Sequence, residues 1–451
     1  MTQFLTLIML RSKYSACILS VLFLIATSCS DKQATKLDDV NILFQNEKIL
    51  TKIIVDDIFS PPVASRIYSY TSLAQYEAIR FIDTNGNESI AEKLNGFPKM
   101  PVPEKGKEYN FLLAATKAFC NVAYDIRIFS KDTLVQYEQQ VLEKFSNSLS
   151  KEVFDRSVAF GDTVAKSILK RAMADKYKQT RGMEKYLGSK DDGKWQPTSP
   201  DYLDGAEPHW SKISYFSLDS ASQFRPMAPC AFSADSNSQF YKMVKAVYSK
   251  GISLTEEEKL IARYWDDNPF VVEHSGHFMV GKKKITPGGH WMGIAAIASK
   301  KANADLVKTA KAFTLTAISL LDAFISCWEA KYHYHYVRPI TQINSWWDGT
   351  WTSFLQTPPF PEFTSGHSTI SGSAAAVLTG LYGDNFAFHD NSDSAFIGLT
   401  RDFNSFNEAA AEASISRFYG GIHYINSLDT GLAKGKLIGA HLLNRVGVSK
   451  K

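Results

Sequence analysis

The stretch EFTSGHSTISGSAAAVLTGLYG, residues 362–383, carries the signals of a helix start followed by a helix. Thr364 or Ser365 can cap the first turn, because a side-chain oxygen there accepts a hydrogen bond from a free backbone N–H group. Small and apolar residues then continue at helical spacing. A helix start also favours anions, so His367 in the first turn raises the question of which anion binds there.

Apolar residues at helical spacing recur on both sides of this stretch. The segments are 61–82, 109–126, 132–149, 150–177, 239–267, 289–335 and 405–424. No run of residues alternates with the period of two that is typical of strands. We therefore predict an all-α protein made of helical bundles, with long loops covering the active site.

The chain has 451 residues, of which 45% are hydrophobic and 21% charged, an ordinary globular composition. A net charge of +4 without a long basic run gives no reason to expect a nucleic-acid partner. Residues 182–239 interrupt the helical pattern but are rich in aromatic residues, which predicts a structured cover. We expect residues 29–239, a helical region with this loop, and the catalytic bundle 240–451 to form one compact domain.

The N-terminus has the layout of a signal peptide, with Arg11 and Lys13 ahead of an apolar run over residues 16–26. Translation from Met9 instead of Met1 would put the basic residues at their usual place. The apolar run is too short for a standard transmembrane helix, and we expect no later stretch long enough to span a bilayer.

The segment IATSC, residues 25–29, resembles a bacterial lipoprotein cleavage box. We expect residues 1–28 to be removed and Cys29 to carry lipid, which would be the protein's attachment to the membrane after export to the periplasm or cell surface. A plain signal peptide is the alternative. Three widely spaced cysteines remain and do not form a disulfide framework. We expect buried thiols at Cys120, Cys230 and Cys327.

Three short clusters supply charged and polar side chains. They contain Lys331 and Arg338 in KYHYHYVRP, then Ser365, Gly366 and His367, and finally Arg417 and His423 in SRFYGGIHY. Each cluster alone fits a helix cap or a helix terminus. Together they suit a tetrahedral oxyanion, because guanidinium forks bind two oxygens each while an ammonium, a hydroxyl and an amide bind the rest. One histidine then remains to bond the central atom and the other to move protons.

The order K-x6-R-P, S-G-H and S-R-x5-H over residues 331–423 resembles the signature of the superfamily that joins type-2 phosphatidic-acid phosphatases with vanadium-dependent haloperoxidases. Residues 240–445 resemble the haloperoxidase branch, with Trp328 three positions before Lys331 and the segment ARYWDDN at 262–268. The length and the leader resemble iodoperoxidases of marine flavobacteria.

The resemblance implies one vanadate per chain, with His423 as the metal ligand and His367 as the acid–base group. It implies that the vanadate oxygens are held by Lys331, Arg338, Ser365, Gly366 and Arg417, with Lys331 also acting in catalysis. Phe360 and Trp328 are candidates for a halide pocket. Asp266 is the implied partner of Arg417, and Asp267 competes for that role.

The chain departs from the family pattern at two positions. Thr364 stands where proline is usual, and threonine can still cap the helix. Ser427 stands four residues after His423, where the family usually has an aspartate. A carboxylate there would fix the tautomer of the ligand histidine and raise its basicity. Ser427 itself and Asp429 are the candidates to support His423.

The resemblance implies oxidation of halide by hydrogen peroxide to hypohalous acid, with iodide expected first and bromide second. The alternative is a vanadate-inhibited acid phosphatase with His423 as nucleophile. The missing aspartate weighs against that alternative more heavily. A third reading is a surface lipoprotein that binds an anion or a glycan. We expect a monomer.

Overall fold

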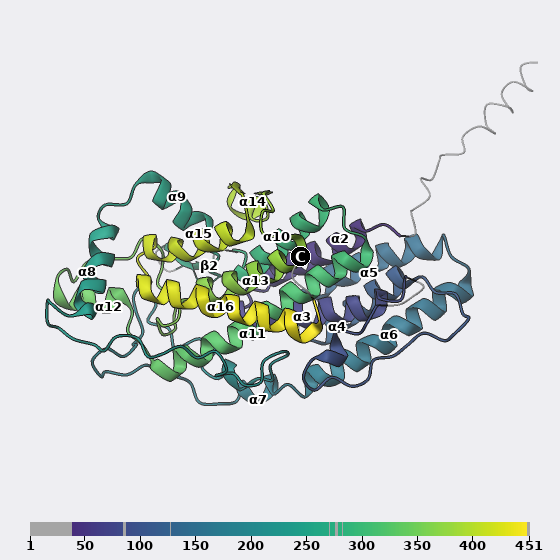
Figure 1. Ribbon diagram of the computed structural model, residues 1–451, viewed down its shortest axis with the longest axis horizontal. Helices are drawn as coiled ribbons and strands as arrows, with labels where there is room; N and C mark the ends of the chain where they lie inside the picture. The colour runs from purple at the N-terminus through teal and green to yellow at the C-terminus, as the bar shows by residue number, and fades with distance from the viewer. Residues whose placement is uncertain are drawn as a thin grey trace, which may run out of the picture. The chain divides into compact units, whose positions relative to one another are not determined.

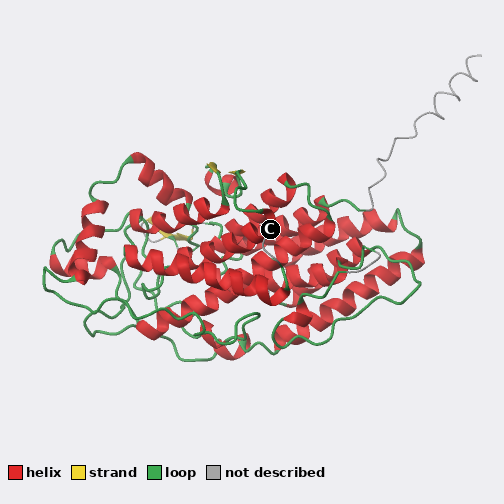
Figure 2. Ribbon diagram, in the orientation of Figure 1, coloured by secondary structure: helices red, strands yellow, loops and turns green. Residues whose placement is uncertain are grey.

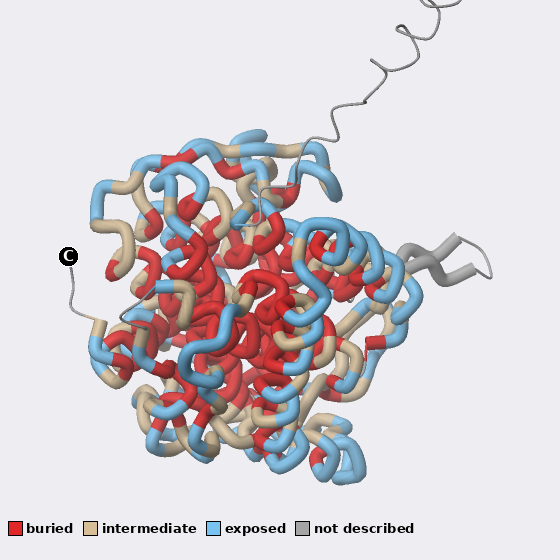
Figure 3. The backbone as a smooth tube through the Cα atoms, turned by 90° about the vertical axis from the view of Figure 1, so that its right-hand side faces the viewer, coloured by how far each residue is buried: buried red, intermediate tan, exposed pale blue. Residues whose placement is uncertain are grey.

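The computed structural model describes residues 38–83, 87–126, 128–269, 271–275, 278–281 and 283–448, with side chains of 272–282 left out. These residues belong to one compact unit. The expected signal peptide, residues 1–28, and Cys29 lie outside the described residues. Figure 3 shows the buried residues gathered around the centre of the unit, with exposed residues on the outside.

Helices dominate the unit, which confirms the predicted all-α class (Figure 2). The first half contains α2 (Asn41–Asp56), α3 (Pro61–Ile79), α4 (Phe111–Asp125), α5 (Lys131–Ser146), α6 (Lys151–Met173) and α7 (Tyr177–Thr180), with short 3-10 turns at Ala91–Lys93 and Trp210–Lys212. The second half contains α8 (Gln239–Gly251), α9 (Glu256–Tyr264), α10 (Pro287–Lys301), α11 (Leu306–Tyr334), α12 (Pro339–Trp346), α13 (Gly366–Tyr382), α14 (Ser394–Ile397), α15 (Phe406–Tyr419) and α16 (Ile425–Val446).

Two short antiparallel strand pairs were not expected from the sequence. They are β1 (Val272–Ser275) with β2 (Phe278–Gly281), and β3 (Phe388–Asp390) with β4 (Arg401–Phe403). Each strand has only three or four residues, which is too short for a period-two pattern to stand out.

Helix α11 is the central helix of the bundle and packs against α3, α10, α13 and α16 (Figure 1). It is long and apolar enough to cross a bilayer, contrary to our expectation that no such stretch follows the leader. In the structure, 94% of its most apolar window is buried inside the protein. Its apolar surface is therefore covered by neighbouring helices, as in the core helix of a bundle.

Helices α13 and α16 pack at very short range. A Cβ atom at Gly435 would lie 2.1 Å from the carbonyl oxygen of Thr369, and one at Gly372 would lie 2.5 Å from that of Leu432. Glycine is required at both places because any side chain would collide with the facing backbone. This close contact fixes the N-terminus of α13, where Ser365 is the cap and accepts from the backbone N–H of Ser368.

The aromatic loop between α7 and α8 packs as a structured cover. Trp195 and Trp210 are fully buried in it. The backbone carbonyl of Ala206 accepts hydrogen bonds from Trp328 Nε1 at 3.1 Å and from the Tyr332 hydroxyl at 2.7 Å. The loop is thereby attached to the C-terminal end of α11.

The three described cysteines are free thiols. Cys120 and Cys327 are buried as expected, whereas Cys230 is only half-buried, because it lies in this loop.

Candidate active site

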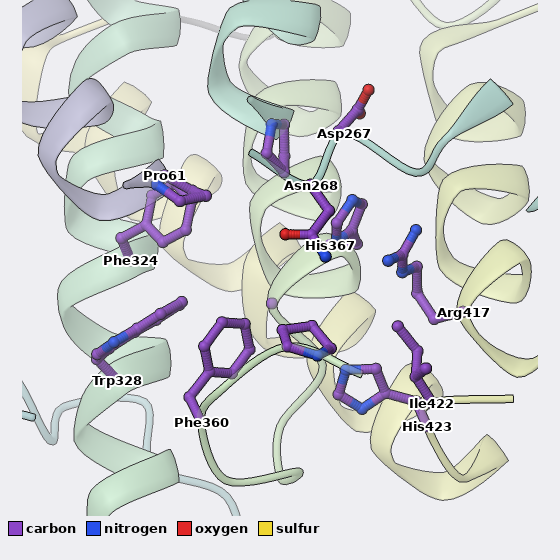
Figure 4. Close-up of a pocket in the computed structure, with 13 residues that line it drawn as sticks. Pro61, Asp267, Asn268, Phe324, Trp328, Phe360, His367, Arg417, Ile422 and His423 are labelled. Atoms are coloured by element: carbon purple, nitrogen blue, oxygen red, sulfur yellow. The ribbon is translucent and has the colours of Figure 1, made fainter. Parts of the chain in front are cut away.

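Five elements bring the three sequence clusters to one place. The cavity in Figure 4 is lined by α11, the start of α13, the end of α15 and the residues before α16. Lys331 at the end of α11 and Arg338 at the start of α12 are attached to this lining by hydrogen bonds to backbone carbonyls of residues 360–362 and 422. Six of the side chains or backbone positions are buried: Lys331, Arg338, Ser365, Gly366, Arg417 and His423. His367 is partly accessible, since it faces the cavity.

Two arginines are held in place by backbone carbonyls and still have free N–H groups. Arg338 donates from Nε to the carbonyl of Phe360 at 2.9 Å and from Nη1 to that of Ile422 at 2.8 Å. Arg417 donates from Nη1 to the carbonyl of Trp265. Arg338 Nη2 and Arg417 Nε and Nη2 are buried without a hydrogen-bond partner among the described residues. Buried N–H groups of this kind are costly unless a ligand satisfies them, and they suit an anion with several oxygens.

The start of α13 adds a hydroxyl and an open backbone position. The Ser365 hydroxyl accepts from the Ser368 hydroxyl at 2.9 Å, which leaves the proton of Ser365 for another acceptor. A Cβ at Gly366 would meet only the Trp328 ring, at 3.8 Å, so the backbone here borders open space. Together with the arginines, these groups fit a tetrahedral oxyanion such as vanadate at a helix N-terminus.

Lys331 is fully buried near Arg338, and both burial and the second positive charge disfavour its charged form. Its ammonium donates to the carbonyls of Pro361 at 2.8 Å and Glu362 at 3.0 Å. Burial, and to a smaller extent the charge of Arg338, lower the pKa of Lys331 to about 7. A bound anion would oppose both effects and keep the ammonium charged.

Glu362 is a functional residue that the sequence reasoning missed. Its carboxylate accepts from His423 Nδ1 at 2.7 Å and from the backbone N–H of Tyr424 at 3.1 Å. Because Nδ1–H is bound, the lone pair of His423 lies on Nε2, which is 3.1 Å from Arg338 Nη1. Burial first, and then Arg338 and Lys331, hold the pKa of His423 well below its usual value, so the ring is neutral. A neutral imidazole oriented by a carboxylate is a good metal ligand.

The sequence offered Ser427 and Asp429 as candidates to support His423, but in the structure Glu362 contacts the Nδ1 atom of this histidine. Asp429 is exposed and does not reach the buried ring. Ser427 is buried, and its hydroxyl has no hydrogen-bond partner among the described residues; it lies close enough to Glu362 to lower the pKa of that carboxyl. Burial dominates and raises the pKa of Glu362 to about 7, against the opposing charges of Arg338 and Lys331. Glu362 lies in the segment EFTS, just before α13. The carboxylate that supports His423 therefore comes from residues before this helix, and not from residues that follow His423.

His367 presents one ring nitrogen to the cavity. Its Nε2 has no hydrogen-bond partner in the described part of the chain. Burial and then Arg417 hold the pKa of His367 well below its usual value. The ring is therefore neutral near pH 7 and can take a proton at Nε2.

Asp266 and Asp267 have separate partners. Asp266 Oδ1 lies 4.0 Å from Arg417 Nη2, and its other oxygen pairs with Lys284. Asp267 instead lies 3.0 Å from Nδ1 of His290. Asp266 is therefore the carboxylate that pairs with Arg417, and Asp267 has a smaller electrostatic interaction with the same guanidinium.

An aromatic wall faces the polar groups across the cavity. Figure 4 shows Phe324, Trp328 and Phe360 on one side and Arg417 and His423 on the other. The rings of Trp328 and Phe360 are 5.0 Å apart at an angle of 52°. Phe360 also lies 5.0 Å from the Lys331 ammonium. Both candidate halide-pocket residues therefore line the same cavity as the predicted anion site.

Comparison with known proteins identifies relatives over most of the chain. The solved structure of a bacterial vanadium-dependent iodoperoxidase is 44% identical, with a TM-score of 0.84, and the match covers 90% of this chain and 96% of that one. Holo and apo structures of a bacterial vanadium-dependent chloroperoxidase are 16% and 17% identical, both with a TM-score of 0.64. They cover 87% and 86% of this chain and 93% and 94% of their own, and they show the shared fold.

Residues 311–448 match the family described as the VCPO second helical-bundle domain. A search of curated protein sequences found no match. The identity of 44% over nine-tenths of the chain, together with a cavity whose free N–H groups fit an oxyanion, shows that this chain belongs to the vanadium-dependent haloperoxidases and that its cofactor is vanadate.

Proposed function

We propose that this chain oxidises iodide with hydrogen peroxide, and bromide more slowly. The reaction is I⁻ + H₂O₂ + H⁺ → HOI + H₂O. The observation that carries the proposal is the group of buried, unpartnered N–H donors of Arg338 and Arg417 beside the lone pair of His423. The preference for iodide is supported by the similarity to a bacterial iodoperoxidase, of which this chain covers 96%.

The residues divide between holding the cofactor and moving protons. Lys331, Arg338, Ser365, Gly366 and Arg417 would bind the vanadate oxygens, and His423 would bond the metal through Nε2. Bound vanadate supplies a Lewis acid that activates peroxide without a change of oxidation state.

His367 Nε2 would take a proton from the incoming peroxide and return it to the oxygen that leaves as water. The charged ammonium of Lys331 would stabilise negative charge on the reacting oxygens, in a site preorganised by the carbonyls of Pro361 and Glu362. The wall of Trp328 and Phe360 would keep bulk water away from the oxygen that iodide attacks.

A phosphatase activity is the second candidate, and the contact between Glu362 and His423 favours it. A histidine that attacks phosphorus needs a carboxylate at its other nitrogen. The absence of an aspartate after His423 argued against this chemistry, but Glu362 fills the same role at 2.7 Å. The objection from the sequence therefore no longer holds.

One pair of assays separates the two activities. Protein loaded with orthovanadate is mixed with hydrogen peroxide and iodide, and triiodide is followed by absorbance. Vanadate-free protein from the same preparation is tested on p-nitrophenyl phosphate. We expect vanadate-dependent triiodide formation and little phosphate release. Phosphate release without vanadate-dependent iodide oxidation would contradict the proposal and favour the phosphatase.

The variant His367→Ala tests the proton transfer separately. It should lower kcat for iodide by about 10²- to 10⁴-fold, the usual value of a general acid–base group. Vanadate binding, measured by equilibrium dialysis, should weaken far less, because His367 is not assigned as a ligand. An equal loss of binding and turnover would show that His367 holds the cofactor.

A further inference from the structure

A second cluster of buried titratable groups lies next to the active site. His290 on α10 is fully buried, with Nδ1 3.0 Å from Asp267 and Nε2 3.1 Å from Asp390, which ends β3. The ring stacks on Trp265 at 4.4 Å between centroids. Asp267 also lines the active-site cavity, and Figure 4 shows its carboxylate pointing away from His367.

A third carboxylate completes the cluster and lacks a partner. Asp393, just before α14, is 98% buried, and its Oδ1 has no hydrogen-bond partner among the residues described. One ligand atom each from Asp267, His290 and Asp393 lies within 4.8 Å of the others. Burial raises the pKa of Asp393 to about 8, so the group takes up a proton unless a cation binds it.

Asp390 has a different role from the other two carboxylates. It accepts from His290 Nε2, from the backbone N–H of Ser392 at 3.0 Å and from the Ser392 hydroxyl at 2.7 Å. These bonds fix the carboxylate and orient the ring, so that Nδ1 faces Asp267. A histidine bound in this way at one nitrogen presents the other nitrogen to a metal ion.

We propose that Asp267, His290 and Asp393 bind a divalent transition-metal ion, of which Zn²⁺ is the best probe. One imidazole nitrogen and two carboxylates form a ligand set that Zn²⁺ accepts with a further water. Nδ1 and the Asp267 oxygen, 3.0 Å apart, are already at the separation of two ligands of one ion, and the three ligand atoms lie within 4.8 Å of one another. The charged groups facing the cluster from other elements include Lys284, which pairs with Asp266 and offsets part of the negative charge.

The metal would stabilise the loop that supports the vanadate site. The carbonyl of Trp265 accepts from Arg417, and the Asp266 carboxylate lies 4.0 Å from the same guanidinium. Asp267 is the next residue, so a metal ion would tie this loop to α10 and to the segment before α14. The ion would act at a distance from the reacting atoms and would take no part in the oxidation of halide.

Metal content and thermal stability test the proposal without any activity assay. Untagged protein, free of vanadate, is treated with a chelator, dialysed, and titrated with Zn²⁺, Mn²⁺ or Ca²⁺ by calorimetry, and bound metal is measured by mass spectrometry. We expect about one Zn²⁺ per chain and a rise in Tm of at least about 3 °C at saturation. Calcium should bind much more weakly, because one ligand is an imidazole.

The variant Asp393→Asn should lower Zn²⁺ affinity at least about tenfold, because it removes one charged ligand while keeping the shape of the side chain. Asp429→Asn, on the exposed side of α16, is the matched control and should bind Zn²⁺ as the wild type does. Failure of the wild-type protein to bind any of the three ions would overturn the proposal, and so would unchanged binding in Asp393→Asn. Neither result depends on halide oxidation, so the proposed function is tested separately.

Discussion

Two buried histidines of this protein each contact a carboxylate, yet their surroundings differ in the sign of the charge. His423 bonds Glu362 through Nδ1, and its other nitrogen faces Arg338. His290 bonds Asp267 through Nδ1, and its other nitrogen faces Asp390. The first ring therefore lies between an anion and a cation, and the second lies between two anions.

This difference determines the protonation of each ring. Burial, Arg338 and Lys331 all hold the pKa of His423 below its usual value, and one carboxylate does not reverse them. Burial also lowers the pKa of His290, but Asp267 and Asp390 together outweigh it and raise the pKa well above the usual value. In the metal-free protein, a buried histidine–carboxylate pair thus holds a neutral ring or a cation, depending on the group at the second nitrogen. A metal ion bound at Nδ1 of His290 would displace the proton from that nitrogen.

The largest expected effect comes from breaking the second pair. His290→Ala leaves Asp267 and Asp390 buried without their common partner, and should lower the free energy of unfolding by roughly 3–5 kcal/mol. Denaturant unfolding in the presence of a chelator measures this effect apart from metal binding. A loss below about 1 kcal/mol would show that the two carboxylates find other partners or protons at little cost.

His423→Ala should have the opposite profile, with a large effect on the cofactor and a small one on stability. The variant removes the only nitrogen assigned to the metal, so vanadate affinity should fall more than about 100-fold. Glu362 can take up a proton when its partner is lost, since burial already raises its pKa to about 7. Equilibrium dialysis with vanadium analysis gives the affinity, and normal vanadate binding in His423→Ala would show that the ligand assignment is wrong.

The two pairs also differ in how far the sequence predicts them. Lys331, Arg338, Ser365, Gly366, Arg417 and His423 were all predicted to share a site. Gly366, Arg417 and His423 line one cavity, and Arg338 contacts His423. Lys331 donates to the carbonyl of Glu362, and Ser365 caps α13 beside it. Their spacing within short segments was informative because each lies at a helix terminus, where local capping signals mark the position. The all-α class was equally predictable, because the helical periodicity is repeated along most of the chain.

The carboxylate partners were not predictable from local patterns. Glu362 is 61 residues from His423, and Asp390 is 100 residues from His290. A glutamate before a helix start reads as a solvated residue, and only tertiary packing shows that its exposed fraction is zero. The family pattern directed attention to Ser427, downstream of the ligand, whereas the chain supplies the carboxylate from upstream.

Glu362→Gln should sharpen the comparison by removing the charge while keeping the hydrogen bond. Vanadate affinity near pH 8 should fall by about 10- to 100-fold, the usual effect of losing a group that orients a metal ligand. In the wild type, affinity should also fall as the pH drops through about 7, because Glu362 becomes protonated there. The variant should lack this part of the pH dependence.

The stability of the vanadate-free protein gives a second readout for Glu362. Its pKa is raised from 4.5 to about 7 in the folded state, so the folded chain binds the proton more tightly. The resulting stabilisation is complete below pH 4.5 and is lost as the pH rises to about 7. Denaturant unfolding of Glu362→Gln should lack this loss, and an identical pH profile in both proteins would contradict the assignment.

The smallest effect is expected from Ser427→Ala. The Ser427 hydroxyl lowers the pKa of Glu362, so its removal should raise that pKa and move the loss of vanadate affinity to higher pH. The affinity at pH 8 should change only a few-fold, about the effect of one neutral hydrogen bond.

Asp429→Asn is the matched control for this variant, since Asp429 is exposed on the same helix and should leave both the affinity and its pH dependence unchanged. If Ser427→Ala shifts the pH dependence and Asp429→Asn does not, Ser427 acts on His423 through Glu362. A loss of affinity that is independent of pH would instead place it directly on His423, as the family pattern suggests. An effect of Asp429→Asn as large as that of Ser427→Ala would mean that surface charge, and not the buried carboxylate, controls the ligand histidine.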